Sequence, residues 1–267
     1  MIGMTGMTAA APWTEVWGAR ELLRSLAVRN LKVKYQRSTL GFAWTLINPL
    51  LTLTVLAAVF THVVKIAVPH YWAFLLSGYF VWNYLLQMIS TATYVLAEHA
   101  GLRRSVAFPS EVLVLSAAAS RLAEFAVEMA LVVAALAVCH HSGVPASFSL
   151  LPLLVLLLIL LSLGLVLPLA VLAAFYNDVQ HAVPILLMML FYASPVFYPV
   201  RLVPEAVRRL YFLNPIAGLL TLYHQVLYEG RFPPPALLGG VAAASVLLFL
   251  IGYAIFNRYK TVLAEIL

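Results

Sequence analysis

Long apolar runs constrain the fold of this chain more than any other feature of its sequence. The hydrocarbon core of a bilayer is crossed by about 20 helical residues. Inside it, every backbone amide must find its partner within the protein, so a run that crosses must form a helix. The runs predict about six spanning helices, at residues 41–66, 71–97, 111–139, 149–176, 182–199 and 236–257.

The composition excludes a water-soluble domain. Of the 267 residues, 64% are hydrophobic and only 10% are charged, and the mean hydropathy is +0.98. A soluble domain carries about 25% charged residues. The first apolar run begins near residue 39, too deep in the chain for a cleavable signal peptide. We therefore expect an all-α integral membrane protein with a single transmembrane domain over residues 1–267.

The distribution of lysine and arginine predicts the orientation of the helices. With both termini inside, and with Arg121 in the third run left out, ten of these residues fall on the cytoplasmic side and five on the outer side. Loops rich in lysine and arginine stay in the cytoplasm. We therefore expect a multi-pass protein of the cytoplasmic (inner) membrane with both termini in the cytoplasm.

A basic stretch, VRNLKVKYQRSTLGFAW, stands directly before the first apolar run. Its cations Lys32, Lys34 and Arg37 form a collar at the start of that run, with Trp44 at the junction. Residues 14–37 have an apolar row opposite basic positions, which predicts a helix that lies along the cytoplasmic interface. On its own, the collar is a topology signal.

The fifth apolar run is followed by a charged segment at residues 200–233. Within it, Asn214 followed by Pro215 has the form of a helix start, and Gly230 is placed to end that helix. The piece between them is too short to cross a bilayer. We expect a re-entrant helical hairpin on the outer side.

Three charged residues, Arg121, Glu124 and Glu128, interrupt the third apolar run at spacings of three and four. Such spacings place them on one face of a helix. Charged groups at this depth face a bundle interior, a partner subunit or water. The pattern favours pairing between helices, and contact with a substrate is the alternative.

Aromatic residues make up 12% of the chain, and many lie near the ends of apolar runs, among them Tyr79, Trp82, Tyr192 and Tyr198. Aromatic belts at the two membrane interfaces and packing within the bundle explain this pattern. The functional alternative is a channel whose ring faces stack on sugars. The sequence leaves both interpretations open.

The motifs of an ATPase or a metal enzyme are missing from the sequence. There is no G-x-x-x-x-G-K-[ST] loop for a nucleotide and no acidic cluster for a catalytic metal. We therefore do not expect this chain to be an enzyme. The short basic loop at residues 97–108 is the candidate docking element for a separate subunit.

Four segments together resemble the membrane subunit of the type-2 ABC exporters of bacterial polysaccharides, which serve O-antigen, capsule and teichoic acid. LKVKYQRSTLGFAWTLINPL is similar to the entry motif of that family, and RRSVAFP to its first cytoplasmic loop. SPVFYP with the later LNP resembles its outer hairpin, and FNRYKTVLAEIL its C-terminal end, which is nearest to O-antigen exporters.

The resemblance implies partners, a substrate and a division of labour. It implies a homodimer with two copies of a separate ATPase that uses ATP and Mg²⁺, while this chain binds no cofactor. The substrate would be a polysaccharide on undecaprenyl pyrophosphate, and membrane lipid but no nucleic acid would contact the chain. Residues 14–37 would be the interface helix and residues 200–233 the outer gate. Coupling to the ATPase would fall to residues 97–108, with Glu98, Arg103, Arg104 and Phe108.

The resemblance also gives the collar a second role, the reception of the pyrophosphate headgroup by cations beside the channel mouth. The residues expected to bind substrate are Lys32, Lys34, Tyr35, Arg37, Trp44, Tyr79, Trp82, Tyr192 and Tyr198.

Three other functions remain open at the level of the sequence. A type-2 ABC permease for a lipid or drug is the first, although the aromatic-rich runs argue against it. An integral membrane enzyme acting on polyprenyl-linked sugars is the second, and the lack of clustered aspartates argues against it. A proton-coupled secondary carrier would show inverted repeats, and the sequence shows no internal repeat.

Overall fold

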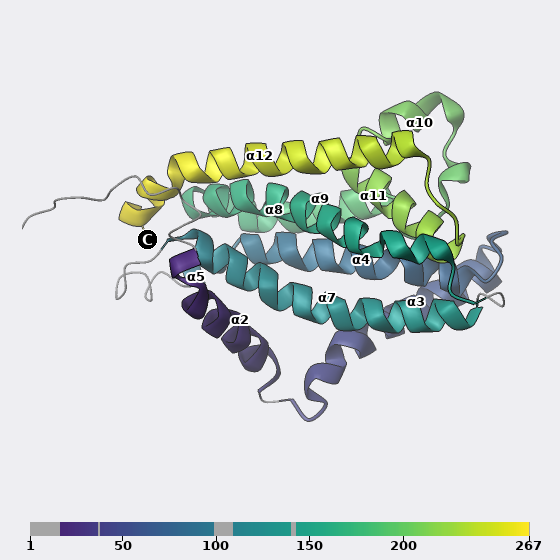
Figure 1. The fold of residues 1–267 in the computed structure, drawn as a ribbon, viewed down its shortest axis with the longest axis horizontal. Helices are drawn as coiled ribbons and strands as arrows, with labels where there is room; N and C mark the ends of the chain where they lie inside the picture. Colours follow the sequence, from purple (N-terminus) through teal and green to yellow (C-terminus); the bar gives the residue numbers. More distant parts are fainter. Residues whose placement is uncertain (1–16, 37, 99–108, 140–142, 267) are drawn as a thin grey trace, which may run out of the picture.

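The computed structural model describes residues 17–36, 38–98, 109–139 and 143–266, and Figure 1 shows long helices packed side by side. No strand occurs in these residues. The all-helical membrane fold expected from the apolar runs is thus confirmed. The helices are α2 (Arg20–Tyr35), α3 (Trp44–Ala58), α4 (Tyr71–Ala92), α5 (Val95–Glu98), α7 (Glu111–Cys139), α8 (Leu151–Phe175), α9 (Asp178–Tyr192), α10 (Glu205–Tyr211), α11 (Pro215–Tyr223) and α12 (Pro235–Ile266).

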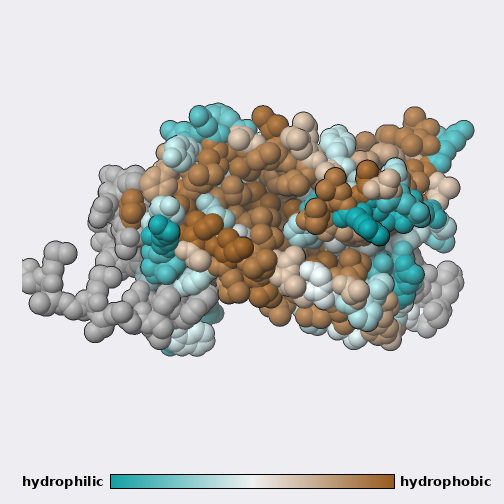
Figure 2. Space-filling view, turned by 90° about the horizontal axis from the view of Figure 1, so that it is seen from above, coloured by the Kyte–Doolittle hydropathy of each residue, from teal (hydrophilic) through white to brown (hydrophobic). Residues whose placement is uncertain are grey.

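Three helical segments of the described chain are long and apolar enough to cross a membrane. They are Gly41–Val63, which contains α3, Ala146–Phe175, which contains α8, and Pro235–Lys260 of α12. Figure 2 shows the apolar surface between two more hydrophilic ends. Helices α4 and α7, of 22 and 29 residues, are long enough and pack against each other and against α8. That α4 and α7 cross the membrane, and that the chain has six spans, remain predictions.

The expected span at residues 182–199 is wrong in its bounds. The observed helix, α9, runs from Asp178 to Tyr192, and its 15 residues reach only about 22 Å. Pro195 and Pro199 follow it, and neither ring nitrogen can donate a helical hydrogen bond. The chain therefore leaves the helix after Tyr192 and turns.

Helix α4 forms the centre of the bundle. It carries no charged residue, and its buried positions occur on every side, as Leu75, Phe80, Val81 and Leu85 illustrate. A helix that is apolar all round is stable only when other helices surround it. Accordingly α4 packs against α3, α7, α8, α9 and α11, and it fixes the positions of all of them.

Helix α2 lies outside this bundle, where Figure 1 shows it as the purple helix beside α7. Its bounds fall within the predicted interface helix at residues 14–37. Leu26 is buried against the bundle, whereas Lys32 and Val33 are exposed. An amphipathic helix at the membrane surface has this distribution.

The outer hairpin consists of an exposed helix and a buried one. Helix α10 exposes most of its residues, and every residue of α11 from Ile216 to Tyr223 is buried. The predicted cap is confirmed, because the side chain of Asn214 accepts a hydrogen bond from the Ile216 amide at 3.0 Å. Gly230 ends the piece with a φ of 64°. Helix α11 packs against α4, α8 and α12, so it re-enters the bundle.

Helices α8 and α12 meet at two glycines. A Cβ atom built on Gly252 would collide with the backbone of Gly164, and one built on Gly164 would meet the Leu248 carbonyl carbon at 2.6 Å. Small residues let two membrane helices approach closely and pack by van der Waals contact. This contact fixes α12 against the bundle.

We expect Gly252→Ala to lower the free energy of unfolding by about 1–3 kcal/mol, the usual cost of overpacking. Gly239→Ala is the matched control, because a Cβ on Gly239 meets no atom within 4 Å. The measurement is the midpoint of thermal unfolding in mild detergent. Equal midpoints for the two variants would contradict the close contact.

Candidate functional site

A groove of about 490 Å³ lies between α3, α4 and α9, and we call it the aromatic groove. It contains three of the aromatic residues expected to bind substrate, Tyr79, Trp82 and Tyr192. Their neighbours in the lining are Thr52, Leu56, Asn83, Leu86, Ser90, Pro184, Leu187, Met188 and Phe191.

A row of ring contacts runs from this groove toward the outer hairpin. The centroids of Trp82 and Phe191 are 5.6 Å apart, and those of Phe191 and Phe197 are 5.3 Å apart. Phe197 contacts Tyr198 at 5.0 Å, and the Tyr198 hydroxyl donates to the Tyr192 carbonyl at 2.9 Å. Tyr198 therefore lies at the outer end of the row rather than in the groove itself.

Polar groups lie among the rings of the groove. The side-chain oxygen of Asn83 accepts a hydrogen bond from Gln87 at 3.2 Å. Its nitrogen is buried and has no partner among the described residues. A polar group at bilayer depth must meet protein, water or a ligand, because lipid tails offer no hydrogen bond.

The groove is flanked by surfaces that carry both polar and apolar side chains. Helix α3 exposes Asn48 and Thr52 beside Leu51, and α9 exposes Met188 and Tyr192. The outer face of α12 differs, because its large exposed side chains between residues 246 and 255 are all aliphatic. Lipid suits the α12 face, whereas the α3 and α9 faces mix aliphatic side chains such as Leu51 and Ile185 with the exposed Asn48 amide, which favours a polar neighbour.

A second cluster fastens α2 to α7, and we call Lys34, Tyr35, Thr45, Arg121 and Glu124 the α2 anchor. The ammonium group of Lys34 lies 3.1 Å from each carboxylate oxygen of Glu124. The Tyr35 hydroxyl donates to Glu124 at 2.7 Å and lies 2.6 Å from the Thr45 hydroxyl. Arg121 forms an ion pair with Glu124 without aligned hydrogen-bond geometry. Pairing between helices, the favoured interpretation, is therefore confirmed for Glu124.

In the α2 anchor, a half-buried cation pairs with a buried acid. The side chain of Glu124 is 1% exposed and that of Lys34 is 44% exposed. Desolvation by burial, together with the charge of Arg121, lowers the pKa of Lys34 from 10.5 to about 8. Lys34 therefore keeps its proton at neutral pH and remains the counter-ion of Glu124.

Glu128 lies one turn beyond the α2 anchor on α7. It is fully buried, and neither carboxylate oxygen has a hydrogen-bond partner among the described residues. Its electrostatic neighbours are Arg121 and Lys34. The cluster thus brings two acids and two cations together between α2 and the bundle.

The other predicted residues fall in different places. Lys32 is exposed on α2, and Trp44 is exposed at the start of α3. Glu98 ends α5. The structure does not describe Arg37, Arg103, Arg104 or Phe108, and for Glu98 it describes the backbone alone. The predicted collar is therefore divided, with Lys34 in the α2 anchor and Lys32 facing solvent.

Sequence analysis did not single out Thr52, Asn83 or Phe191, all of which line the aromatic groove. A signal for Asn83 was present, because Tyr79, Trp82, Asn83, Leu86 and Ser90 recur at helical spacing on one face of α4. In the described chain, no three His, Cys, Asp or Glu side chains form a group that could hold a metal ion.

Comparison with known proteins gives consistent results. The sequence model of the ABC-2 type transporter family matches residues 21–228. A protein of Myxococcus xanthus named O-antigen export system permease protein RfbA is 32% identical over 253 residues, which cover 94% of this chain and 97% of that protein. A Klebsiella pneumoniae protein of the same name is 26% identical over 250 residues, which cover 92% and 95%.

We expect Tyr35→Phe to loosen α2 from α7, because the hydroxyl bond to the charged Glu124 contributes about 1–3 kcal/mol. The measurement is the rate at which a water-soluble maleimide labels Leu26→Cys in a Cys139→Ser background. Leu26 is only 4% exposed on α2, so the rate reports detachment. It should rise about fivefold or more.

The matched control for this measurement is Tyr259→Phe, which removes a hydroxyl from a 40% exposed ring on α12. It should leave the labelling rate unchanged. Equal rates in the Tyr35 variant and its parent would contradict the role assigned to the anchor.

Proposed function

The chain belongs to the ABC-2 type transporter family, and on that premise we propose that it is the membrane subunit of an ATP-driven polysaccharide exporter. The substrate is a polysaccharide linked to undecaprenyl pyrophosphate, such as O-antigen or capsule, and it crosses the cytoplasmic membrane. The observation that carries the proposal is the aromatic groove, in which Tyr79, Trp82 and Tyr192 meet. The relatives named O-antigen export permeases support the choice of substrate.

The chemistry of the aromatic groove suits a sugar chain. Ring faces give apolar contact to the C–H faces of a pyranose, and they tolerate sliding because the contact has no fixed partner atom. Asn83 and Thr52 offer hydrogen bonds to hydroxyl groups. A lipid tail would use the rings but not these polar groups.

A homodimer would complete the groove as a channel. The segment that contains α3 has 11% of its most apolar stretch buried within one chain, close to the 17% of the α12 segment, so its polar residues rather than its exposure distinguish it from a lipid-facing helix. Within the α3 segment, the exposed side-chain amide of Asn48 favours a protein or aqueous neighbour over lipid, whereas the Thr52 hydroxyl already donates to the Asn48 carbonyl at 3.1 Å. Two copies placed with their α3 and α9 faces together would enclose the rings of both grooves.

Energy would come from two copies of a separate ATPase subunit that uses ATP and Mg²⁺. The sequence of this chain has no nucleotide-binding loop. We assign the coupling contact to residues 97–108, with Glu98, Arg103, Arg104 and Phe108, on the cytoplasmic side together with both termini. Helix α5 packs against α4, α7 and α8. A displacement of this loop would therefore be transmitted to the helices that carry the aromatic groove and the α2 anchor.

The basic collar supplies the entry site for the pyrophosphate in this proposal. Lys34 already neutralises Glu124 in the α2 anchor, which leaves Lys32 and Arg37 as the cations to receive the headgroup. The Tyr35 hydroxyl is engaged by Thr45 and Glu124. Tyr35 therefore supports the entry site indirectly, by holding α2 in place. Trp44, 38% exposed at the junction, is placed for the first sugars.

We expect Tyr192→Ala to reduce export about five- to tenfold, because it removes apolar ring contact worth about 1–1.5 kcal/mol. Tyr176→Ala is the matched control, since the two rings are 62% and 63% exposed and only Tyr192 lines the groove. The measurement is surface polysaccharide in cells, normalised to permease in the membrane. Unchanged export in the Tyr192 variant, or an equal loss in the control, would overturn the proposal.

A further inference from the structure

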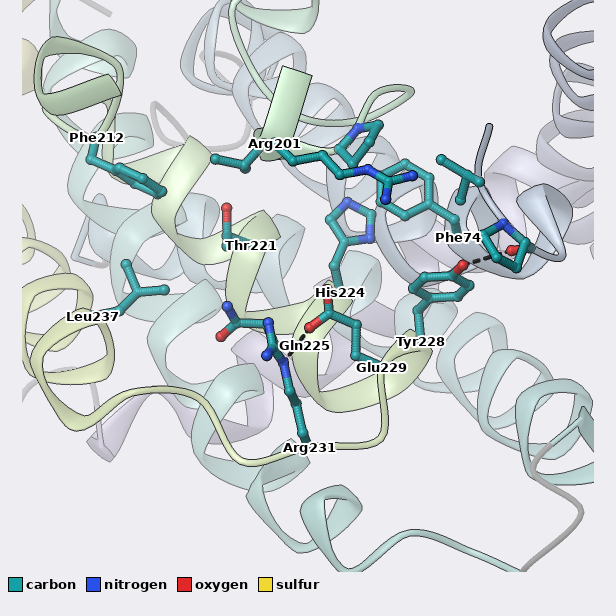
Figure 3. Close-up of a pocket in the computed structure, with 14 residues that line it drawn as sticks. Phe74, Arg201, Phe212, Thr221, His224, Gln225, Tyr228, Glu229, Arg231 and Leu237 are labelled. Atoms are coloured by element: carbon teal, nitrogen blue, oxygen red, sulfur yellow. Dashed lines mark hydrogen bonds and ion pairs between the residues drawn. The ribbon is translucent and has the colours of Figure 1, made fainter. Parts of the chain in front are cut away.

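A second cavity lies beneath the outer hairpin, away from the aromatic groove, and Figure 3 shows it in close-up. We call it the outer chamber. Its volume is about 310 Å³, and its walls come from residues 68–74, 199–212, 221–231 and the start of α12. It therefore lies where four separate segments of the chain meet.

One wall of the outer chamber is held by hydrogen bonds and ring contacts. The two ring nitrogens of buried His224 lie 2.7 Å from the Ser77 hydroxyl and 2.7 Å from the Pro195 carbonyl. Its ring stacks on Phe74 with a centroid distance of 4.1 Å. The Tyr228 hydroxyl donates to the Pro69 carbonyl at 2.6 Å. Such a wall is formed before any ligand arrives.

The chamber also holds polar groups with capacity for further hydrogen bonds. In the described part of the chain, the side chain of Arg201 donates to one acceptor, the carbonyl of Ala67. The Oε1 atom of Gln225 is buried there without a partner. The Thr221 hydroxyl donates to the Ala217 carbonyl at 2.7 Å, which leaves its lone pairs free to accept. Figure 3 shows Arg201 reaching from one side and Gln225 lying on the other.

The charges in the chamber argue against a strongly anionic ligand. Glu229 brings a carboxylate into the lining, and it pairs with Arg231 at 2.5 Å. Only Arg201 remains without a counter-ion among the lining residues. Hydroxyl groups fit this arrangement, because each can accept from Arg201 and donate to the unpaired oxygen of Gln225. An unmet buried acceptor costs about 1–3 kcal/mol, which a ligand donor would recover.

We propose that the outer chamber binds a single saccharide ring of the exported polymer after it has crossed the membrane. The assignment rests on the proposed function, which supplies the polymer. The volume lies at the lower end of the range for small-molecule pockets, about 300–1,000 Å³, so the chamber takes one ring rather than a chain. A ring held there resists the return of the polymer and links the outer hairpin to α4 and α12.

The test uses the full chain in nanodiscs and does not depend on transport. Val200→Cys, in a Cys139→Ser background, places one thiol in the chamber lining, and its reaction with a membrane-impermeant maleimide is timed. The probes are methyl pyranosides of hexoses, 6-deoxyhexoses and N-acetylhexosamines. A site with a dissociation constant of about 10 mM should slow labelling about tenfold at about 100 mM probe.

Two variants and two controls sharpen this test. Arg201→Gln and Gln225→Leu should each abolish the protection, whereas Arg209→Gln, the same change at an exposed position outside the lining, should preserve it. A thiol at Glu205→Cys, a side chain that is 91% exposed on α10, should show no protection by any probe.

Three results would overturn the assignment. They are the absence of protection by every pyranoside, equal protection at Glu205→Cys, and protection that survives both Arg201→Gln and Gln225→Leu. Each of them would leave the export phenotype of the aromatic groove intact. Failure of this inference is thus distinguishable from failure of the proposed function.

Discussion

Hydrocarbon supplies no hydrogen-bond partner, and the placement of polar side chains in this chain follows from that constraint. It distinguishes two faces of the same bundle. The exposed face of α12 carries aliphatic side chains and suits lipid, whereas the face made by α3 and α9 exposes Asn48 and Tyr192 among aliphatic side chains such as Leu51 and Ile185. The exposed amide of Asn48 and the unpaired amide nitrogen of Asn83 favour another protein chain, water or a substrate at the aromatic groove. The proposed homodimer and the proposed channel both rest on this distinction.

The same constraint explains the α2 anchor. Glu124 lies in a largely apolar helix, and its charge is stable there because Lys34, Tyr35 and Arg121 surround it. Helix α2 is thereby tied to the bundle by charged hydrogen bonds, not only by its apolar row. Because α7 packs against α4, a movement of α2 would be transmitted to the helix that carries Tyr79 and Trp82.

The local features that sequence reasoning predicted are those with a local cause. Long apolar runs predicted the helices, and Asn214 before Pro215 predicted a cap that the structure contains. The spacing of Arg121, Glu124 and Glu128 predicted a shared face, but the partner of Glu124 depends on how α2 folds back, which no local pattern specifies. The bounds of the fifth run failed because hydropathy does not register where Pro195 and Pro199 stop a helix. The outer chamber joins segments far apart in sequence, so sequence reasoning did not detect it.

The central claim is that two copies of this chain meet through their α3 and α9 faces around the aromatic groove. The most direct measurement is cross-linking in native membranes with a short bifunctional maleimide, in a Cys139→Ser background. Leu51→Cys, Met188→Cys and their combination should yield a covalent dimer, whereas Leu247→Cys on α12 should not, although the three side chains are 58%, 59% and 58% exposed. A dimer formed through Leu247→Cys and by none of the α3 or α9 variants would contradict the account.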